Sequence, residues 1–255
     1  QIAVSDGQWE VTVICPLSLS CEACQMEEGT KYNPDALKPL EFVCEPDPRN
    51  LWFVRLDSVK GFRPIEIEEH YAVVAKYVLR KSVPREVFVQ FETAKNLYLY
   101  AWYVYRFYPI AEHYAISCLE FALRTRFEDE LPEKYIPRSG KPTLKHYLQY
   151  GVDYGYIRNE GFRRWHEAAE KRARTRYDME KTEEMREKGL TSIELDYSEI
   201  EIKDEDKNFG YVTSLIKHLT SVRNDYAHGS ATLDRGALRI IEPVSEIINQ
   251  IYNDN

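Results

Sequence analysis

The sequence predicts a mainly α protein, a helical bundle preceded by a small β-rich N-terminal region. After residue 85, apolar residues recur at helical intervals along most of the chain. Before residue 85, short segments with the composition of strands alternate with proline-containing turns. We therefore expect a β-rich region over residues 1–84 and a helical bundle over residues 85–255.

Four segments of the N-terminal region contain the β-branched and aromatic residues that strands favour. They span residues 9–13, 41–43, 51–56 and 71–74. The turn-rich stretches of this region contain Pro34, Pro39, Pro46, Pro48 and Pro64. Proline fixes φ and removes a backbone donor, so it separates regular elements. The expected result is a small fold of short strands.

Four of the five cysteines also fall in this region, namely Cys15, Cys21, Cys24 and Cys44. Cys21 and Cys24 form a Cys-x-x-Cys pair, and four thiolates can hold a structural zinc ion in tetrahedral geometry. A complete zinc site normally has two close pairs, whereas this region has one. Ordinary thiols and disulfides therefore stand beside the zinc interpretation. The fifth cysteine, Cys118, lies on an expected apolar helix face and is predicted to pack in the core.

The helical region begins with a periodic stretch over residues 87–107. Pro109 restarts a helix that is expected to run to about residue 130, because proline is well tolerated in a first helical turn. A connector follows, with Pro132, Pro137, Gly140 and Pro142. Thr143 is then expected to cap a third helix that ends near residue 156.

A long charged helix is expected over residues 161–188, almost without an apolar stripe, as an arm that projects from the bundle. Basic residues are frequent in its first half, where they form either a nucleic-acid-binding surface or a solvated helix face; they are Arg163, Arg164, Lys171, Arg172, Arg174 and Arg176. Residues 193–206 are read as a strand or an extended loop. The last two helices are expected over residues 208–228 and 233–252.

The end of the penultimate helix carries the cluster that is most informative about function: Arg223, Asn224 and His228. Asn224 and His228 are four residues apart, so they share a helix face that points away from the apolar stripe, and Arg223 lies on the border. The stripe itself consists of Leu215, Ile216, Leu219, Val222 and Tyr226. Arginine can grip phosphate oxygens in bidentate fashion, and histidine titrates near neutrality. An arginine and a histidine at a helix end can equally be ordinary surface residues.

This cluster resembles the signature of the HEPN superfamily, in which an arginine, four to six residues and a histidine end a late helix; here the gap is four. Residues 115–127 look like the early helix of that family, with a Leu-Glu pair at Leu119 and Glu120 before an Ala-Leu-Arg run. Residues 141–157 are similar to its middle helix. The resemblance covers about residues 85–253.

The resemblance implies a HEPN-like helical bundle that pairs as a homodimer, with the clusters of both chains in one cleft. It implies a metal-independent endoribonuclease, of the kind found among toxin and defence effectors, in which a ribose 2′-hydroxyl attacks the neighbouring phosphorus of RNA. His228 is then the general acid or base, Arg223 stabilises the phosphorane charge, and Asn224 positions the substrate. No cofactor is implied for catalysis. Glu120 is expected either to orient the cluster or to pair with Arg124.

The resemblance leaves a second function open, because many members of the superfamily have lost catalysis. The alternative is a non-catalytic dimeric module that binds RNA, a nucleotide or a partner protein. Some family toxins carry a tyrosine two residues after the histidine, which a nucleotidyltransferase partner modifies. Ser230 occupies that position here, which argues against such a partner but leaves an inhibitory partner protein of another kind among the expectations.

Composition narrows the class of protein further. The formal net charge of −8 argues against nonspecific coating of nucleic acid, although a local basic cleft remains compatible with it. The most apolar stretch, residues 97–108, is short and broken by Arg106, so we expect no membrane span. The first residues lack the pattern of a signal peptide, so we expect a cytoplasmic protein. The chain also contains no phosphate-binding glycine loop, no Gly-x-Ser-x-Gly elbow and no His-Glu-x-x-His motif.

Overall fold

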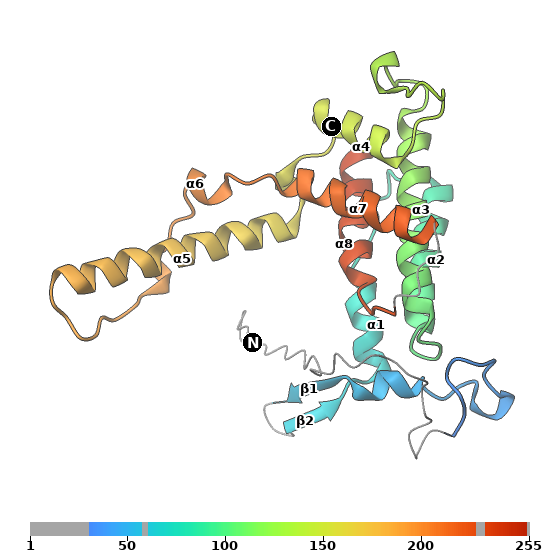
Figure 1. Ribbon diagram of the computed structural model, residues 1–255, viewed down its shortest axis with the longest axis horizontal. Coiled ribbons are helices and arrows are strands. Elements are labelled where there is room, and N and C mark those ends of the chain that lie inside the picture. Colours follow the sequence, from blue (N-terminus) through green and yellow to red (C-terminus); the bar gives the residue numbers. More distant parts are fainter. Residues whose placement is uncertain (1–30, 58–60, 228–232, 254–255) are drawn as a thin grey trace. The chain divides into compact units, whose positions relative to one another are not determined.

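The computed structural model describes residues 31–57, 61–227 and 233–253 (Figure 1). Most of these residues are helical, and a two-stranded antiparallel sheet lies near the N-terminal end of the described chain. The predicted class, mainly α with a small β element near the N-terminus, is therefore confirmed. None of the described helices combines the length and apolar character that crossing a membrane requires.

The elements follow one another in a simple order. The strands are β1 (Val54–Asp57) and β2 (Gly61–Pro64). The α-helices are α1 (Ile67–Ala75), α2 (Arg85–Tyr100), α3 (Phe107–Phe127), α4 (Leu144–Asp153), α5 (Arg163–Glu187), α6 (Asp204–Lys207), α7 (Tyr211–Ala227) and α8 (Leu238–Ile251). Short 3₁₀ helices span Leu40–Phe42, Pro48–Trp52, Glu133–Tyr135, Asn159–Gly161 and Tyr197–Glu199.

The chain divides into two compact units that interleave in sequence. Of the described residues, the first unit contains 31–57, 61–79, 84–118 and 233–242, and the second contains 80–83, 119–227 and 243–253. Helices α3 and α8 contribute residues to both units, because the boundaries at 118/119 and 242/243 fall inside these two helices.

Two of the predicted N-terminal strands are wrong. Residues 41–43 belong largely to a 3₁₀ helix, Leu40–Phe42, and residues 71–74 lie inside α1. Helix α1 begins with a capping box in which Glu66 and Glu69 satisfy backbone N–H groups reciprocally. Its two buried residues, His70 and Val74, are four apart, which is a helical spacing. The segment 51–56 was partly correct, because β1 begins at Val54, whereas residues 9–13 lie outside the described residues.

A buried asparagine joins the N-terminal segment of the first unit to the turn between α2 and α3. Asn50 is 1% exposed, and its Nδ2 donates to the carbonyl oxygens of Ala101 at 3.0 Å and Trp102 at 2.9 Å. The hydroxyl of Tyr108 donates to the Asn50 Oδ1 at 3.1 Å. Buried polar groups are stable when they are paired in this way. Around them, α2 buries Val87, Phe91, Ala94 and Tyr98 at helical spacing.

In the second unit, α4 begins as the sequence predicts. Thr143 and His146 form a capping box at its start. Phe127 of α3 packs edge-on against Tyr150 of α4, with ring centroids 5.0 Å apart. The apolar interior is completed by residues of α3, α7 and α8, including Leu119, Leu123, Leu219, Val244, Ile248 and Ile251.

Helix α5 differs from its prediction. It does have an apolar stripe, because Trp165, Ala169, Ala173 and Tyr177 are buried at intervals of four. Helix α6 lies alongside α5 (Figure 1), where the Arg176 guanidinium pairs with Asp206 at 2.9 Å. The expectation of a helix almost without a stripe was wrong because small alanines and a short neighbouring helix make the buried face narrow.

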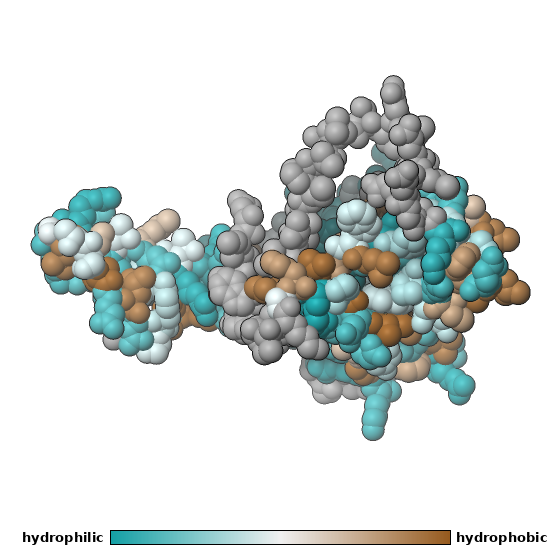
Figure 2. All heavy atoms as spheres, turned by 90° about the horizontal axis from the view of Figure 1, so that it is seen from below, coloured by the Kyte–Doolittle hydropathy of each residue, from teal (hydrophilic) through white to brown (hydrophobic). Residues whose placement is uncertain are grey.

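The surface of this α5–α6 segment is nevertheless not uniformly polar. Met179 and Tyr197 are 68% and 50% exposed. Figure 2 shows hydrophobic residues interspersed with hydrophilic ones over this segment.

Candidate functional site

Helix α7 presents its predicted stripe to the interior of the second unit. Leu215, Ile216 and Leu219 are buried, and Val222 and Tyr226 are partly exposed. The start of the helix is fixed by the backbone N–H of Val212, which donates to the Asn159 side chain at 3.0 Å. The predicted orientation of the helix is therefore confirmed, and it places the motif residues at the edge of the apolar face.

Arg223 lies at this edge and forms an ion pair with Glu120 of α3. The Arg223 Nε and the Glu120 Oε2 are 3.6 Å apart, with side chains 39% and 28% exposed. Among the described residues Arg223 has no other carboxylate partner. The alternative pair of Glu120 with Arg124 is absent from the described part of the chain, where Arg124 instead lies over the Phe121 ring at 5.7 Å. The structure thus brings together two of the predicted site residues.

This ion pair contributes little to the stability of the fold and leaves part of the guanidinium available. A partly exposed pair at this separation contributes about 1 kcal/mol or less to folding. A guanidinium has five N–H donors, so a contact at Nε leaves the two terminal nitrogens to bind an anion. Glu120 therefore contacts the Nε side of Arg223 and leaves the edge with the two terminal nitrogens available.

Of the other two members of the cluster, the structure describes Asn224 but not His228. Asn224 is exposed, on the side of α7 that faces away from the stripe. His228 and Ser230 lie outside the described residues, so the predicted sharing of one face by Asn224 and His228 stays a prediction.

The cysteine hypothesis falls mostly outside the described chain. Cys15, Cys21 and Cys24 lie in residues 1–30, which are not described, and Cys44 is an exposed free thiol. Within the described ranges no group of three or more His, Cys, Asp or Glu side chains is placed to hold a metal. Cys118 is fully buried, and burial raises the pKa of its thiol to about 12, which suits the predicted packing role.

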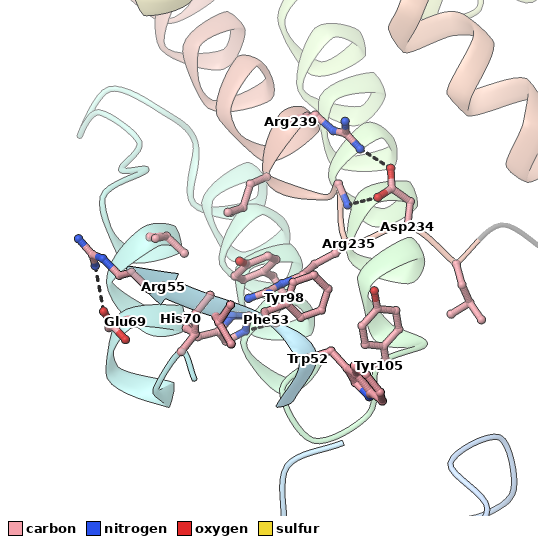
Figure 3. A pocket seen from close by; sticks show the side chains of 16 residues that line it. Trp52, Phe53, Arg55, Glu69, His70, Tyr98, Tyr105, Asp234, Arg235 and Arg239 are labelled. Carbon is pink, nitrogen blue, oxygen red and sulfur yellow. Dashed lines mark hydrogen bonds and ion pairs between the residues drawn. The ribbon is translucent and has the colours of Figure 1, made fainter. Parts of the chain in front are cut away.

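The structure also contains a cavity that the sequence did not suggest, within the first unit (Figure 3). Its volume is about 490 Å³. Residues 52–55, α1, α2 and residues 233–239 around the start of α8 line it, among them Trp52, Phe53, Glu69, His70, Tyr98 and Arg235. These segments are distant in sequence, and no local pattern connects them.

Arg235 and His70 are the chemically distinctive groups of this cavity. The Arg235 guanidinium carbon lies 4.1 Å from the Phe53 ring centroid and 5.6 Å from that of Tyr108. The His70 Nε2 lies 2.9 Å from the Tyr98 carbonyl oxygen. Burial lowers the pKa of His70 to about 4, so its imidazole is neutral at pH 7.

Comparison with known proteins adds no further constraint, since no family model, curated protein or solved structure matches the chain. Functional inference therefore depends on the chemistry of these two places, the end of α7 and the cavity of the first unit.

Proposed function

We propose that this chain is a metal-independent endoribonuclease of HEPN type, with the family's helical bundle and a catalytic cluster at the end of α7. The observation that carries the proposal is the Glu120–Arg223 ion pair. These residues come from two segments, 103 positions apart by subtraction of their numbers, that resemble the early and late helices of the family. Their contact is what a shared catalytic role requires, and neither periodicity nor composition demanded it.

In the proposed reaction, the 2′-hydroxyl of a ribose attacks the adjacent phosphorus. The bond from phosphorus to the 5′-oxygen breaks, leaving a cyclic phosphate and a 5′-hydroxyl. Arg223, held by Glu120 at Nε, offers its terminal nitrogens to the phosphorane oxygens. His228 transfers a proton as general acid or base, and Asn224 positions the phosphate by hydrogen bonding.

A homodimer completes this proposal. Arg223 and His228 are five residues apart, so on one helix their side chains point in directions about 140° apart. One phosphate does not easily contact both side chains of the same chain. A two-fold pairing that joins two α7 ends in one cleft would allow the arginine of one chain to act with the histidine of its partner. The net charge of −8 favours a narrow choice of RNA rather than general binding.

The decisive experiment measures RNA cleavage by the purified chain in excess chelator. Wild type is compared with His228→Ala and Arg223→Ala, and dimer formation and thermal stability are monitored for each. The histidine change is expected to slow cleavage about 100-fold or more, because a general acid–base is lost. His218→Ala is the matched control, since His218 is an exposed histidine on the same helix, and it should cleave like wild type.

Equal cleavage by all four proteins would indicate a contaminating nuclease and reject the role assignments. Binding of RNA by wild type without any cleavage, lost in Arg223→Ala, would favour the non-catalytic dimeric module instead. A cyclic-phosphate product is required by the proposed chemistry, so a linear 3′-phosphate formed directly would contradict it.

A further inference from the structure

The cavity of the first unit holds a cation, Arg235, that no acid of the described residues neutralises. Within the described chain, no carboxylate lies in ion-pair distance of Arg235. The neighbouring Asp234 is engaged elsewhere, because its carboxylate pairs with Arg239 and accepts from the backbone N–H of Gly236 at 3.0 Å. Figure 3 shows the Arg235 side chain reaching instead toward Phe53 and Tyr98.

The groups that hold Arg235 leave its charge intact. Its guanidinium lies over the rings of Phe53 and Tyr108, and its positive charge lowers the pKa values of the Tyr98 and Tyr108 hydroxyls against the larger effect of burial. Burial raises the pKa of Tyr98 to about 12, and that of Tyr108 rises as well, so both hydroxyls are neutral at pH 7. The cavity lining also contains Arg55 and Arg239 against the two acids Glu69 and Asp234, so three arginines face two carboxylates. An anion is the complementary ligand.

Aromatic side chains supply a second recognition element. Phe53 and Tyr105 stack with centroids 6.5 Å apart and an interplanar angle of 12°. Trp52 also lines the cavity, yet it is 73% exposed. An exposed indole beside a cationic cavity offers a free face to a planar ring, and stacking of bases on aromatic side chains is a common mode of nucleotide recognition.

The third element is a buried hydrogen-bond acceptor without a partner. Because a carbonyl only accepts, the His70 Nε2 must carry the proton that it donates to Tyr98. The Nδ1 of this neutral ring then has a lone pair, and it is buried with no hydrogen-bond partner in the described structure. Leaving such an atom unsatisfied is unfavourable, and a ligand N–H or O–H would relieve it.

We propose that this cavity binds a mononucleotide: its phosphate pairs with Arg235, its base stacks on the aromatic wall, and a base or ribose donor reaches His70. The volume of about 490 Å³ lies within the usual range for small-molecule sites. The proposal goes beyond the ribonuclease function and is independent of it, because every residue involved belongs to the first unit and Arg223 and Glu120 belong to the second.

Isothermal titration calorimetry on the full chain tests this, with AMP, GMP, CMP and UMP as probes and no RNA present. At least one of the four should bind at least about tenfold more tightly than both its own nucleoside and inorganic phosphate, because it alone joins the charge and the ring. The nucleoside arm reports the base contribution, and the phosphate arm reports the anion contribution.

Three variants assign the binding to this cavity. Arg235→Gln should weaken the nucleotide about tenfold or more while leaving the nucleoside nearly unchanged. Arg106→Gln is the matched control: Arg106 is in the same unit, is 49% exposed, pairs with Asp35 and does not line the cavity. It should bind like wild type. His70→Phe keeps an aromatic ring against Tyr98 and should weaken nucleotide and nucleoside alike.

Several results would overturn the proposal. These are no binding of any of the four nucleotides by folded wild type at millimolar concentration, phosphate binding as tightly as the nucleotide, or equal loss in Arg235→Gln and Arg106→Gln. Circular dichroism and melting curves establish folding, and Arg235→Lys supplies a second variant if Arg235→Gln does not fold. This lysine variant keeps the charge, so it should bind nucleotide better than nucleoside.

Discussion

Two arginines lie in different surroundings. Arg223 is near the end of α7 in the second unit, and Arg235 precedes α8 in the first unit. Arg223 is paired with a carboxylate and partly exposed. Arg235 is surrounded by aromatic rings and neutral hydroxyls, and no acid of the described chain pairs with it. The carboxylate of Glu120 partly balances the positive charge of Arg223. The aromatic rings around Arg235 contact its guanidinium but leave its positive charge unbalanced by any acid of the described residues.

The largest expected effect concerns the first of these units at acid pH. The pKa of His70 is lowered to about 4 in the folded chain, against about 6.5 in the unfolded chain. Between these values the unfolded state binds more protons, so the free energy of unfolding should fall as pH falls from 6.5 to 4, by on the order of 3 kcal/mol. Urea titrations at several pH values measure this.

The variant His70→Phe should remove this pH dependence of the free energy of unfolding. The separate pH dependence that Glu69 contributes should remain. The pKa of Glu69 is lowered to about 2, chiefly by Arg63, so its contribution is present above about 4.5 and is lost as pH falls toward 2. A slope between pH 4 and 6.5 that persists in His70→Phe would show that another group is responsible.

The next largest effect is on the rate of RNA cleavage, and it distinguishes the charge of Arg223 from the planar geometry of its guanidinium. Arg223→Lys keeps the charge but loses the planar fork, so cleavage should slow by about 100-fold, within the range for losing an oxyanion donor. Single-turnover cleavage of one labelled RNA measures it. Activity near that of wild type would mean that a point charge suffices at this position and that bidentate contact is not part of the mechanism.

The smallest effect isolates the Glu120 contact. Glu120→Gln should change the free energy of unfolding by about 1 kcal/mol or less, because the pair is partly exposed. Cleavage should nevertheless fall by roughly tenfold, since a misaligned guanidinium loses part of its transition-state interaction. A loss of stability without any loss of rate would reduce this contact to an ordinary surface ion pair.

Local periodicity predicted more of α7 than of any other element. The stripe through Leu219 fixed which side of the helix is buried, and the border position of Arg223 followed from it. The Glu120 partner was one of two predicted alternatives. Choosing between them required tertiary structure, because an i,i+4 pair with Arg124 was equally available to the chain.

The cavity could not be predicted from the sequence. His70 lay beside a segment read as a strand, because Val73 and Val74 are β-branched and local propensity there opposes the helix that tertiary packing produces. Arg235 was expected inside the last helix, over residues 233–252, whereas α8 begins only at Leu238. Their proximity depends on segments far apart in the chain, and composition contains no information about that proximity.

The exposure of Trp52 has a practical consequence. The other described tryptophans, Trp102 and Trp165, are each 5% exposed, whereas Trp52 is 73% exposed at the rim of the cavity. An indole in water emits at longer wavelength than a buried one, and a base stacked on it quenches that emission. Under the proposed stacking, a bound nucleotide would quench the emission of Trp52, and a fluorescence titration of the unlabelled chain would follow binding.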